Sequence, residues 1–67
     1  MNFELKEWRR LRGITMEDLA KMVGVSKVTI WKWEKGTTEP RISDMKKLRK
    51  ALSLKAKDTI TLPKRLT

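Results

Sequence analysis

The chain is short and strongly basic, with 67 residues, 17 lysines and arginines against 8 acidic residues, and a net charge of +9. This length fits one small domain. It contains no cysteine and no histidine, which excludes disulfides, thiol catalysis and the commonest general base. Without a glycine-rich phosphate loop or paired inward carboxylates, we expect neither an enzyme nor a bound cofactor.

The charge balance indicates an anionic partner, such as a nucleic acid, an acidic protein or a membrane surface. Of the net charge of +9, +8 lies from Ser26 onward. No apolar run approaches the roughly 20 residues of a transmembrane helix, and the N-terminal residues lack the apolar stretch of a signal peptide. We therefore expect a soluble, cytoplasmic protein without a membrane partner.

The first predicted helix spans Phe3 to Arg12, and Gly13 follows it as a cap. In this helix Leu5, Trp8 and Arg9 share one face. The second predicted helix has Thr15 as its N-cap and ends at Val23. Its apolar stripe, at helical spacing, consists of Met16, Leu19, Ala20 and Val23.

The third predicted helix follows the short turn Gly24-Val25-Ser26, begins after the N-cap Ser26 and ends before Gly36. Two short helices joined by such a turn have the layout of a helix-turn-helix, whose second helix enters the major groove of DNA. On a helical wheel the inward face of this helix consists of Ile30, Trp33 and Glu34.

The fourth predicted helix follows the proline-containing loop 37–41, with Ser43 as its N-cap and an end near Leu52. Its predicted buried stripe is Ile42, Met45, Leu48, Ala51 and Leu52. Two readings stay open for the tail. Lys55 to Thr59 form one helical turn, or Asp58 to Leu62 form a short strand that Pro63 stops.

The outward face of the third helix carries Val28, Lys32 and Lys35, with Trp31 at its border. A solvated face is normally rich in Glu, Lys and Gln, and a single exposed valine is common on any surface. A valine among cations fits a groove surface better, because aliphatic groups contact thymine methyls and lysines donate to guanine acceptors or phosphates.

Two charged residues occupy apolar-face positions. Arg9 lies one turn after Leu5 in the first helix, and Glu34 lies one turn after Ile30 in the third. A buried charge needs a partner. We therefore predict an Arg9–Glu34 ion pair that holds the third helix and has no catalytic role.

Several segments together resemble the phage repressor and Cro family of helix-turn-helix regulators, also called the Xre family. They are Arg9, Thr15–Ala20, Gly24–Ser26, Thr29-Ile30, Trp33–Gly36 and Pro40. The resemblance runs from about Leu5 to Leu54. It implies a compact all-α fold of four or five helices, like that of lambda repressor, over residues 1–54. It also implies a transcriptional regulator, in our reading a repressor, that binds operator DNA as a dimer. No small-molecule ligand is expected, since residues 1–67 contain no sensor domain.

The resemblance assigns roles to residues at matching positions. Base contacts are expected from Lys27, Val28, Thr29 and Lys32. Contacts to the DNA backbone are expected from Met16, Ser26, Trp31, Lys35, Thr37, Thr38 and Arg41. Met16 departs from the glutamine that the family often has there, and Lys46 and Arg49 replace apolar residues. We expect these two side chains to be solvated or to reshape a dimer surface.

The tail, residues 55–67, contains apolar residues outside the helical stripes. We expect a two-fold contact through Leu54, Ile60 and Leu62, which would place two recognition helices about 34 Å apart, one turn of DNA. The alternatives are a frayed tail or a tail folded back on its own domain. The competing function is a protein-interaction module, such as an antitoxin or adaptor subunit.

Overall fold

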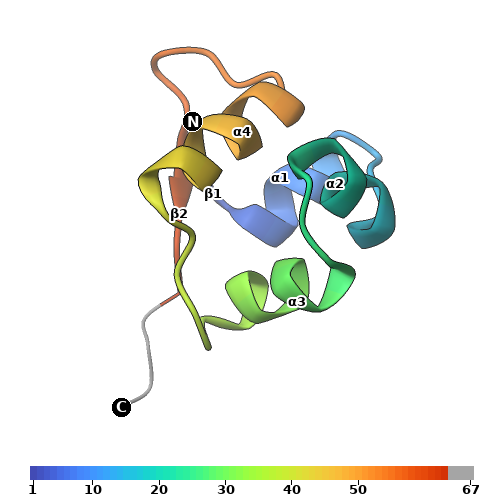
Figure 1. Cartoon of the computed structure of the whole chain (residues 1–67). Helices are drawn as coiled ribbons and strands as arrows, with labels where there is room; N and C mark the ends of the chain where they lie inside the picture. The colour runs from blue at the N-terminus through green and yellow to red at the C-terminus, as the bar shows by residue number, and fades with distance from the viewer. Residues whose placement is uncertain (64–67) are drawn as a thin grey trace.

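The computed structural model describes residues 1–63, so residues 64–67 of the tail lie outside the described part. The elements in chain order are β1 (Asn2–Glu4), α1 (Leu5–Leu11), α2 (Met16–Val23), α3 (Lys27–Lys35), α4 (Ile42–Ala51) and β2 (Thr59–Thr61). Four helices surround one core, and the first and last segments lie side by side (Figure 1). The four-helix form of the predicted fold is confirmed, with one small strand pair added.

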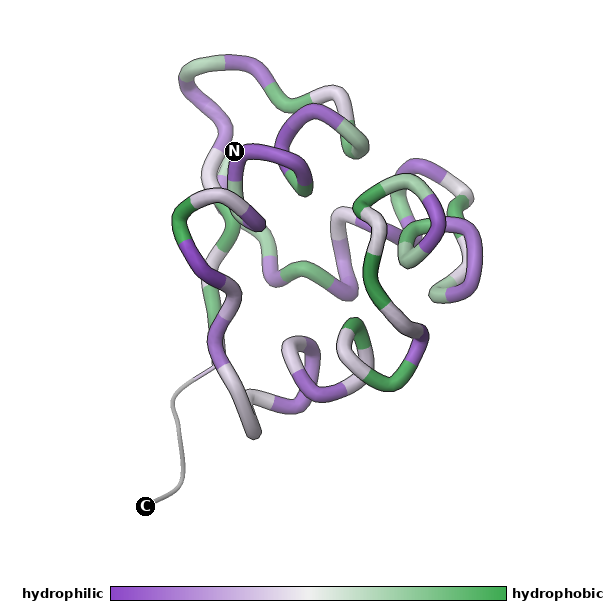
Figure 2. Tube along the Cα trace, in the orientation of Figure 1, coloured by the Kyte–Doolittle hydropathy of each residue, from purple (hydrophilic) through white to green (hydrophobic). Residues whose placement is uncertain are grey.

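The core is built from the apolar stripes of the helices. Hydrophobic residues recur between hydrophilic ones along each helix (Figure 2), the pattern of helices with one buried face. The buried hydrophobic residues are Leu5, Trp8, Leu19, Ala20, Val23, Ile30, Trp33, Leu48 and Leu52. Trp8 and Trp33, each placed on an inward face by its spacing, both belong to this set.

The helices α2 and α3 begin and end at the capping residues that the sequence indicates. Thr15 Oγ1 accepts from the backbone N–H of Asp18 at 3.1 Å, and Ser26 Oγ accepts from that of Thr29 at 3.2 Å. Each bond satisfies a donor that the first turn of a helix leaves without a partner. Gly24 and Gly36 close α2 and α3 in the left-handed conformation, with φ of +83° and +82°.

The start of the first helix and the start of the fourth were predicted wrongly. Residues 2–4 form a strand, so α1 begins at Leu5 and not at Phe3. The N-cap of α4 is Arg41, whose backbone N–H donates to Asp44 Oδ2 at 3.1 Å, and Ser43 lies inside the first turn. Ile42 is 80% exposed, because it lies about 100° around the wheel from the centre of the Leu48–Leu52 face.

The tail folds back on its own domain. β2 pairs in parallel with β1, with Phe3 opposite Ile60. The predicted short strand is therefore present, but it covers Thr59–Thr61 and leaves out Asp58 and Leu62. Leu54 and Ile60 are half-buried and pack against the core. Leu62 is also half-buried. All three residues, which were expected at a dimer contact, are thus partly covered by their own domain.

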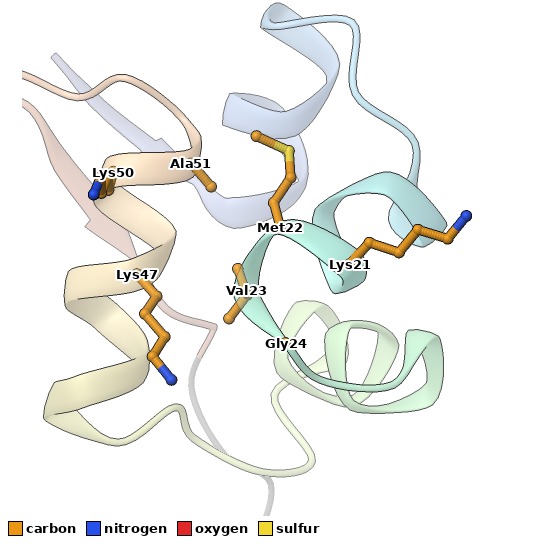
Figure 3. Close-up of a pocket in the computed structure, with 7 residues that line it drawn as sticks. All are labelled: Lys21, Met22, Val23, Gly24, Lys47, Lys50 and Ala51. Carbon is orange, nitrogen blue, oxygen red and sulfur yellow. The ribbon is translucent and has the colours of Figure 1, made fainter.

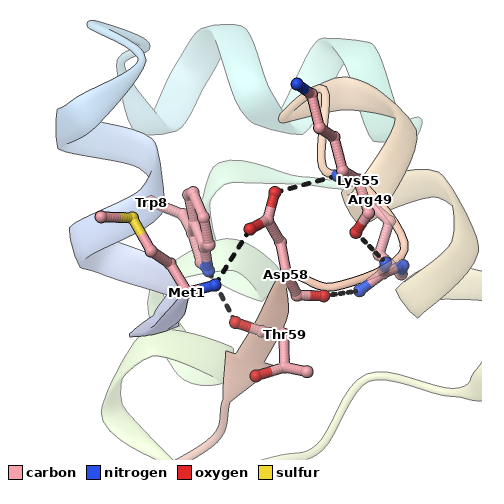
Figure 4. A network of polar contacts seen from close by, with 6 residues as sticks. All are labelled: Met1, Trp8, Arg49, Lys55, Asp58 and Thr59. Atoms are coloured by element: carbon pink, nitrogen blue, oxygen red, sulfur yellow. Dashed lines mark hydrogen bonds and ion pairs between the residues drawn. The ribbon is translucent and has the colours of Figure 1, made fainter.

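A polar network holds the turn before β2 (Figure 4). Asp58 accepts from the Lys55 N–H at 3.0 Å and from the amino group of Met1 at 3.1 Å. Arg49 donates to the carbonyls of Lys55 and Asp58 at 2.8 and 2.7 Å. Trp8 Nε1 donates to the Thr59 carbonyl at 2.8 Å. Arg49 is half-buried, and its two hydrogen bonds hold this turn in place. Lys46 is exposed, as expected.

Stability is expected to fall at low pH through Asp58. The Lys55 N–H and then the Met1 amino group lower the pKa of this carboxyl below its ordinary value of 3.8, against the opposing effect of burial. A depressed folded-state pKa contributes stability above the unfolded value, which is lost as the pH falls through the folded value. Urea unfolding of Asp58→Asn and wild type between pH 7 and pH 2 measures this contribution. The difference in unfolding free energy should shrink below pH 4, and a constant difference would contradict it.

The two glycine caps differ in their surroundings, which gives a matched pair of variants. A Cβ at Gly36 would lie 3.1 Å from Pro63 Cγ and 3.3 Å from its carbonyl oxygen, whereas a Cβ at Gly24 meets nothing within 4 Å. Both alanine variants bear the left-handed strain of about 1–2 kcal/mol. Gly36→Ala is expected to cost about 1 kcal/mol more through overpacking, measured by urea unfolding. Equal losses would mean that Pro63 moves aside freely.

Candidate nucleic-acid interface

The helix-turn-helix consists of α2, the turn 24–26 and α3. The turn is closed by the N–H groups of Gly24 and Val25, which donate to the Ala20 carbonyl at 2.8 and 3.0 Å. α2 packs against both α3 and α4. α3 lies along the lower edge of the molecule in Figure 1, with its outer side facing away from the other helices.

The inner face of α3 fixes its position on the domain. Ile30 and Trp33 are buried in the core. The expected ion pair is present: Arg9 Nε lies 2.8 Å from Glu34 Oε2 and Nη2 lies 3.4 Å from Oε1. Arg9 Nη1 also donates to the Ile14 carbonyl at 3.0 Å. One guanidinium thus joins α1, the loop before α2 and α3.

The ion pair is largely removed from water, since the side chains of Arg9 and Glu34 are 11% and 4% exposed. A pair of this kind gains little net stability, because the cost of desolvation offsets the attraction, but the geometry that satisfies it is narrow. The pair therefore favours one orientation of α3 against the core.

The outer face of α3 is exposed and carries no acidic residue. Val28 is 58% exposed and Trp31 46%. Lys27, Lys32 and Lys35 are also exposed. Lys35 Nζ lies 5.6 Å from the centre of the Trp31 ring, a cation–π contact that keeps this lysine beside the ring. Cationic donors, a methyl-bearing side chain and a flat ring are thus presented together.

Thr29 is held differently from its neighbours. It is half-buried, and its hydroxyl lies 2.9 Å from that of Ser26. Ser26 Oγ also caps the Thr29 N–H. The Thr29 hydroxyl therefore already has one hydrogen-bond partner within this cap, which leaves it fewer sites for a base or phosphate.

The charges across the turn are coupled in a way that sequence spacing does not indicate. Lys27 Nζ lies 3.3 Å from Glu17 Oε1, and both side chains are well exposed. Glu17 lies near the start of α2 and Lys27 at the start of α3, so the tight turn brings them together. An exposed pair of this kind contributes at most about 1 kcal/mol, so Lys27 remains available to an anion.

The loop after α3 lies at the same edge of the molecule. Thr37 and Arg41 are exposed, while Thr38 is half-buried. The Thr37 N–H donates to the Lys32 carbonyl at 3.0 Å, which fastens the loop to the end of α3. At the other end of the interface Met16 is half-buried at the first turn of α2, so part of its side chain packs against the core.

These features define a DNA-binding regulator of the helix-turn-helix class. Residues 5–58 match the model of the helix-turn-helix family, and the chain belongs to that family. It is 41% identical over 58 residues to an uncharacterized HTH-type transcriptional regulator of Methanocaldococcus jannaschii. That alignment covers 87% of this chain and 88% of the relative. The predicted regulator class, of Xre and Cro type and without enzymatic activity, is thereby confirmed. Within residues 1–63, no helix is both long and apolar enough to cross a bilayer.

Proposed function

We propose that this protein is a repressor that inserts α3 into the major groove of a specific operator. The observation that carries the proposal is the contrast between the two faces of α3. Its inner face is locked by Ile30, Trp33 and the Arg9–Glu34 pair, while its outer face presents lysines, Val28 and Trp31 to solvent. A rigid, basic and partly apolar helix face suits base edges in the major groove.

The proposed base contacts come from Lys27, Val28 and Lys32, with Thr29 assisting. Lysines at the first and sixth positions of α3 donate to guanine acceptors, and Val28 contacts a thymine methyl. The DNA backbone is held on either side by Met16, Ser26, Trp31, Lys35, Thr37, Thr38 and Arg41. Backbone N–H groups at the start of α2 and the cations of the loop serve as phosphate ligands.

The repressor is further proposed to act as a homodimer through the region that contains Leu54, Ile60 and Leu62. Half-sites about 34 Å apart would give an operator with two-fold symmetry. Sedimentation with and without operator DNA measures the state of assembly. A monomer at millimolar concentration under both conditions would contradict this part of the proposal.

Selection from randomised duplex DNA at two salt concentrations tests operator binding. Wild type should enrich one motif, whereas Lys27→Ala/Lys32→Ala should enrich none and bind the wild-type motif roughly 10²-fold more weakly. The matched control, Lys6→Ala/Lys57→Ala, removes the same charge from exposed positions outside α3. It should keep the motif and lose only a modest, salt-dependent part of the affinity.

Two outcomes would contradict the proposal. In the first, the control pair abolishes enrichment as fully as the α3 pair does, so that the total charge matters and the helix does not. In the second, wild type binds DNA at low salt without enriching any sequence, which would make the basic surface a general nucleic-acid face.

A further inference from the structure

A groove lies between the second half of α2 and the second half of α4. Its volume is about 600 Å³, and seven residues line it: Lys21, Met22, Val23, Gly24, Lys47, Lys50 and Ala51. Figure 3 shows Val23 pointing toward α4 and Met22 and Ala51 near each other, with Lys47 and Lys50 on α4 and Lys21 extending outward from α2. None of these residues belongs to the proposed DNA interface.

The floor of the groove is apolar. Met22 is 54% exposed, although the residue that follows it in α2, Val23, belongs to the core. Ala51 is half-buried on the facing helix. Methionine is flexible and polarizable, so an exposed methionine beside small residues adapts readily to an apolar side chain brought by a partner.

The rim of the groove is uniformly basic. Lys21, Lys47 and Lys50 are exposed, and the lining contains no acidic residue. Among the ion pairs within residues 1–63, none involves these three lysines. These lysines thus have no ion-pair partner within the described part of the molecule, and the carboxylates of an acidic partner would supply one.

The groove is separated from the outer face of α3. Figure 1 shows α3 at the lower edge of the molecule, with α2 and α4 above it. DNA phosphates would pair with the lysines but have no apolar group to cover Met22. The combination of apolar floor and basic rim therefore favours a protein ligand over a second nucleic-acid contact.

We propose that this groove binds a short acidic segment of a partner protein. One large apolar side chain of that segment packs on Met22 and Ala51, and its carboxylates lie beside the three lysines. The proposal is independent of operator binding, since none of the residues that line the groove belongs to the proposed DNA interface. It adds a third interface to the proposed DNA-binding face and the proposed dimer contact.

The probe is a fluorescein-labelled peptide of Asp, Glu and Ser with Leu-Phe at its centre. The control peptide has Ser-Ser in place of Leu-Phe and the same charge. Binding to the full chain is followed by fluorescence anisotropy, and the site is located by amide chemical shifts in NMR spectra. The expected shifts fall on residues 21–24 and 47–51, and the Leu-Phe peptide binds roughly tenfold more tightly than the control.

Two triple variants separate the groove from total charge. Lys21→Glu/Lys47→Glu/Lys50→Glu should weaken peptide binding roughly tenfold or more relative to Lys6→Glu/Lys46→Glu/Lys57→Glu, which reverses three other exposed lysines. Met22→Ser should remove the preference for Leu-Phe. Thermal unfolding of each variant, followed by circular dichroism, verifies that the fold is retained.

Three results would overturn the inference. The Ser-Ser peptide binds as tightly as the Leu-Phe peptide, or both triple variants weaken peptide binding equally, or the groove triple variant lowers DNA affinity far beyond the control triple variant. The last result would assign the lysines to DNA phosphates. A failed operator selection would leave the peptide results unaffected, so the two proposals fail separately.

Discussion

Replacing Glu34 by alanine is expected to unfold a large part of the population at 25 °C. The variant leaves the Arg9 guanidinium, 11% exposed, without its carboxylate. Removing one partner of a buried pair costs about 3–5 kcal/mol. This is about the whole stability that a single core of this size supplies without disulfides. Urea unfolding followed by circular dichroism measures the loss.

The control is the double variant Arg9→Met/Glu34→Leu, which removes both charges and keeps apolar volume. It should recover most of the lost stability, because replacing both members of a buried pair is often neutral. A residual loss of about 1 kcal/mol is expected, since the Ile14 carbonyl loses its donor. Glu34→Ala with an unchanged unfolding midpoint would mean that water screens the pair, contrary to its burial.

Trp8→Ala is the second variant for which a large loss is expected, about 3–5 kcal/mol. Trp8 is the largest fully buried side chain among residues 1–63. Its ring lies 5.1 Å from that of Phe3, edge to face, and Arg12 lies 5.5 Å above it. The same side chain thus packs the core and binds β2 through the Thr59 carbonyl.

Trp8→Phe separates these two roles. It keeps most of the apolar volume and loses the 2.8 Å hydrogen bond to Thr59, with an expected cost of about 1–3 kcal/mol. Amide hydrogen exchange should then accelerate in residues 59–61 more than in α2 or α3. Uniform acceleration across the whole chain would show that the bond does not hold β2 specifically.

Periodicity and capping residues were sufficient to predict the four helices and the helix-turn-helix. Thr15, Ser26, Gly24 and Gly36 act on neighbouring backbone groups, so their effect is visible in a short window of sequence. The Arg9–Glu34 pair was also predictable, although its partners are 25 residues apart. Each occupies an apolar-face position, and a charge placed there requires an opposite charge.

Contacts between distant segments explain the errors and the omissions. Nothing in the local sequence of residues 2–4 favours an extended strand. They are extended because β2, 57 residues further along the chain, supplies their strand partner. Arg49 was expected to be solvated or at a dimer surface, yet it donates to two carbonyls of the tail turn. Glu17 was not singled out, because its contact with Lys27 depends on the angle between α2 and α3.

The sequence by itself determined the four helices, the exposed basic face of α3 and the class of regulator, because these follow from local periodicity, capping and charge. Only the tertiary structure decided that the tail pairs with β1, that Ile42 is exposed, and that residues of α2 and α4 together line a groove with three lysines. These features depend on contacts between segments that are far apart in the sequence. Such contacts are set by the packing of the whole core and leave no short-range pattern in the sequence.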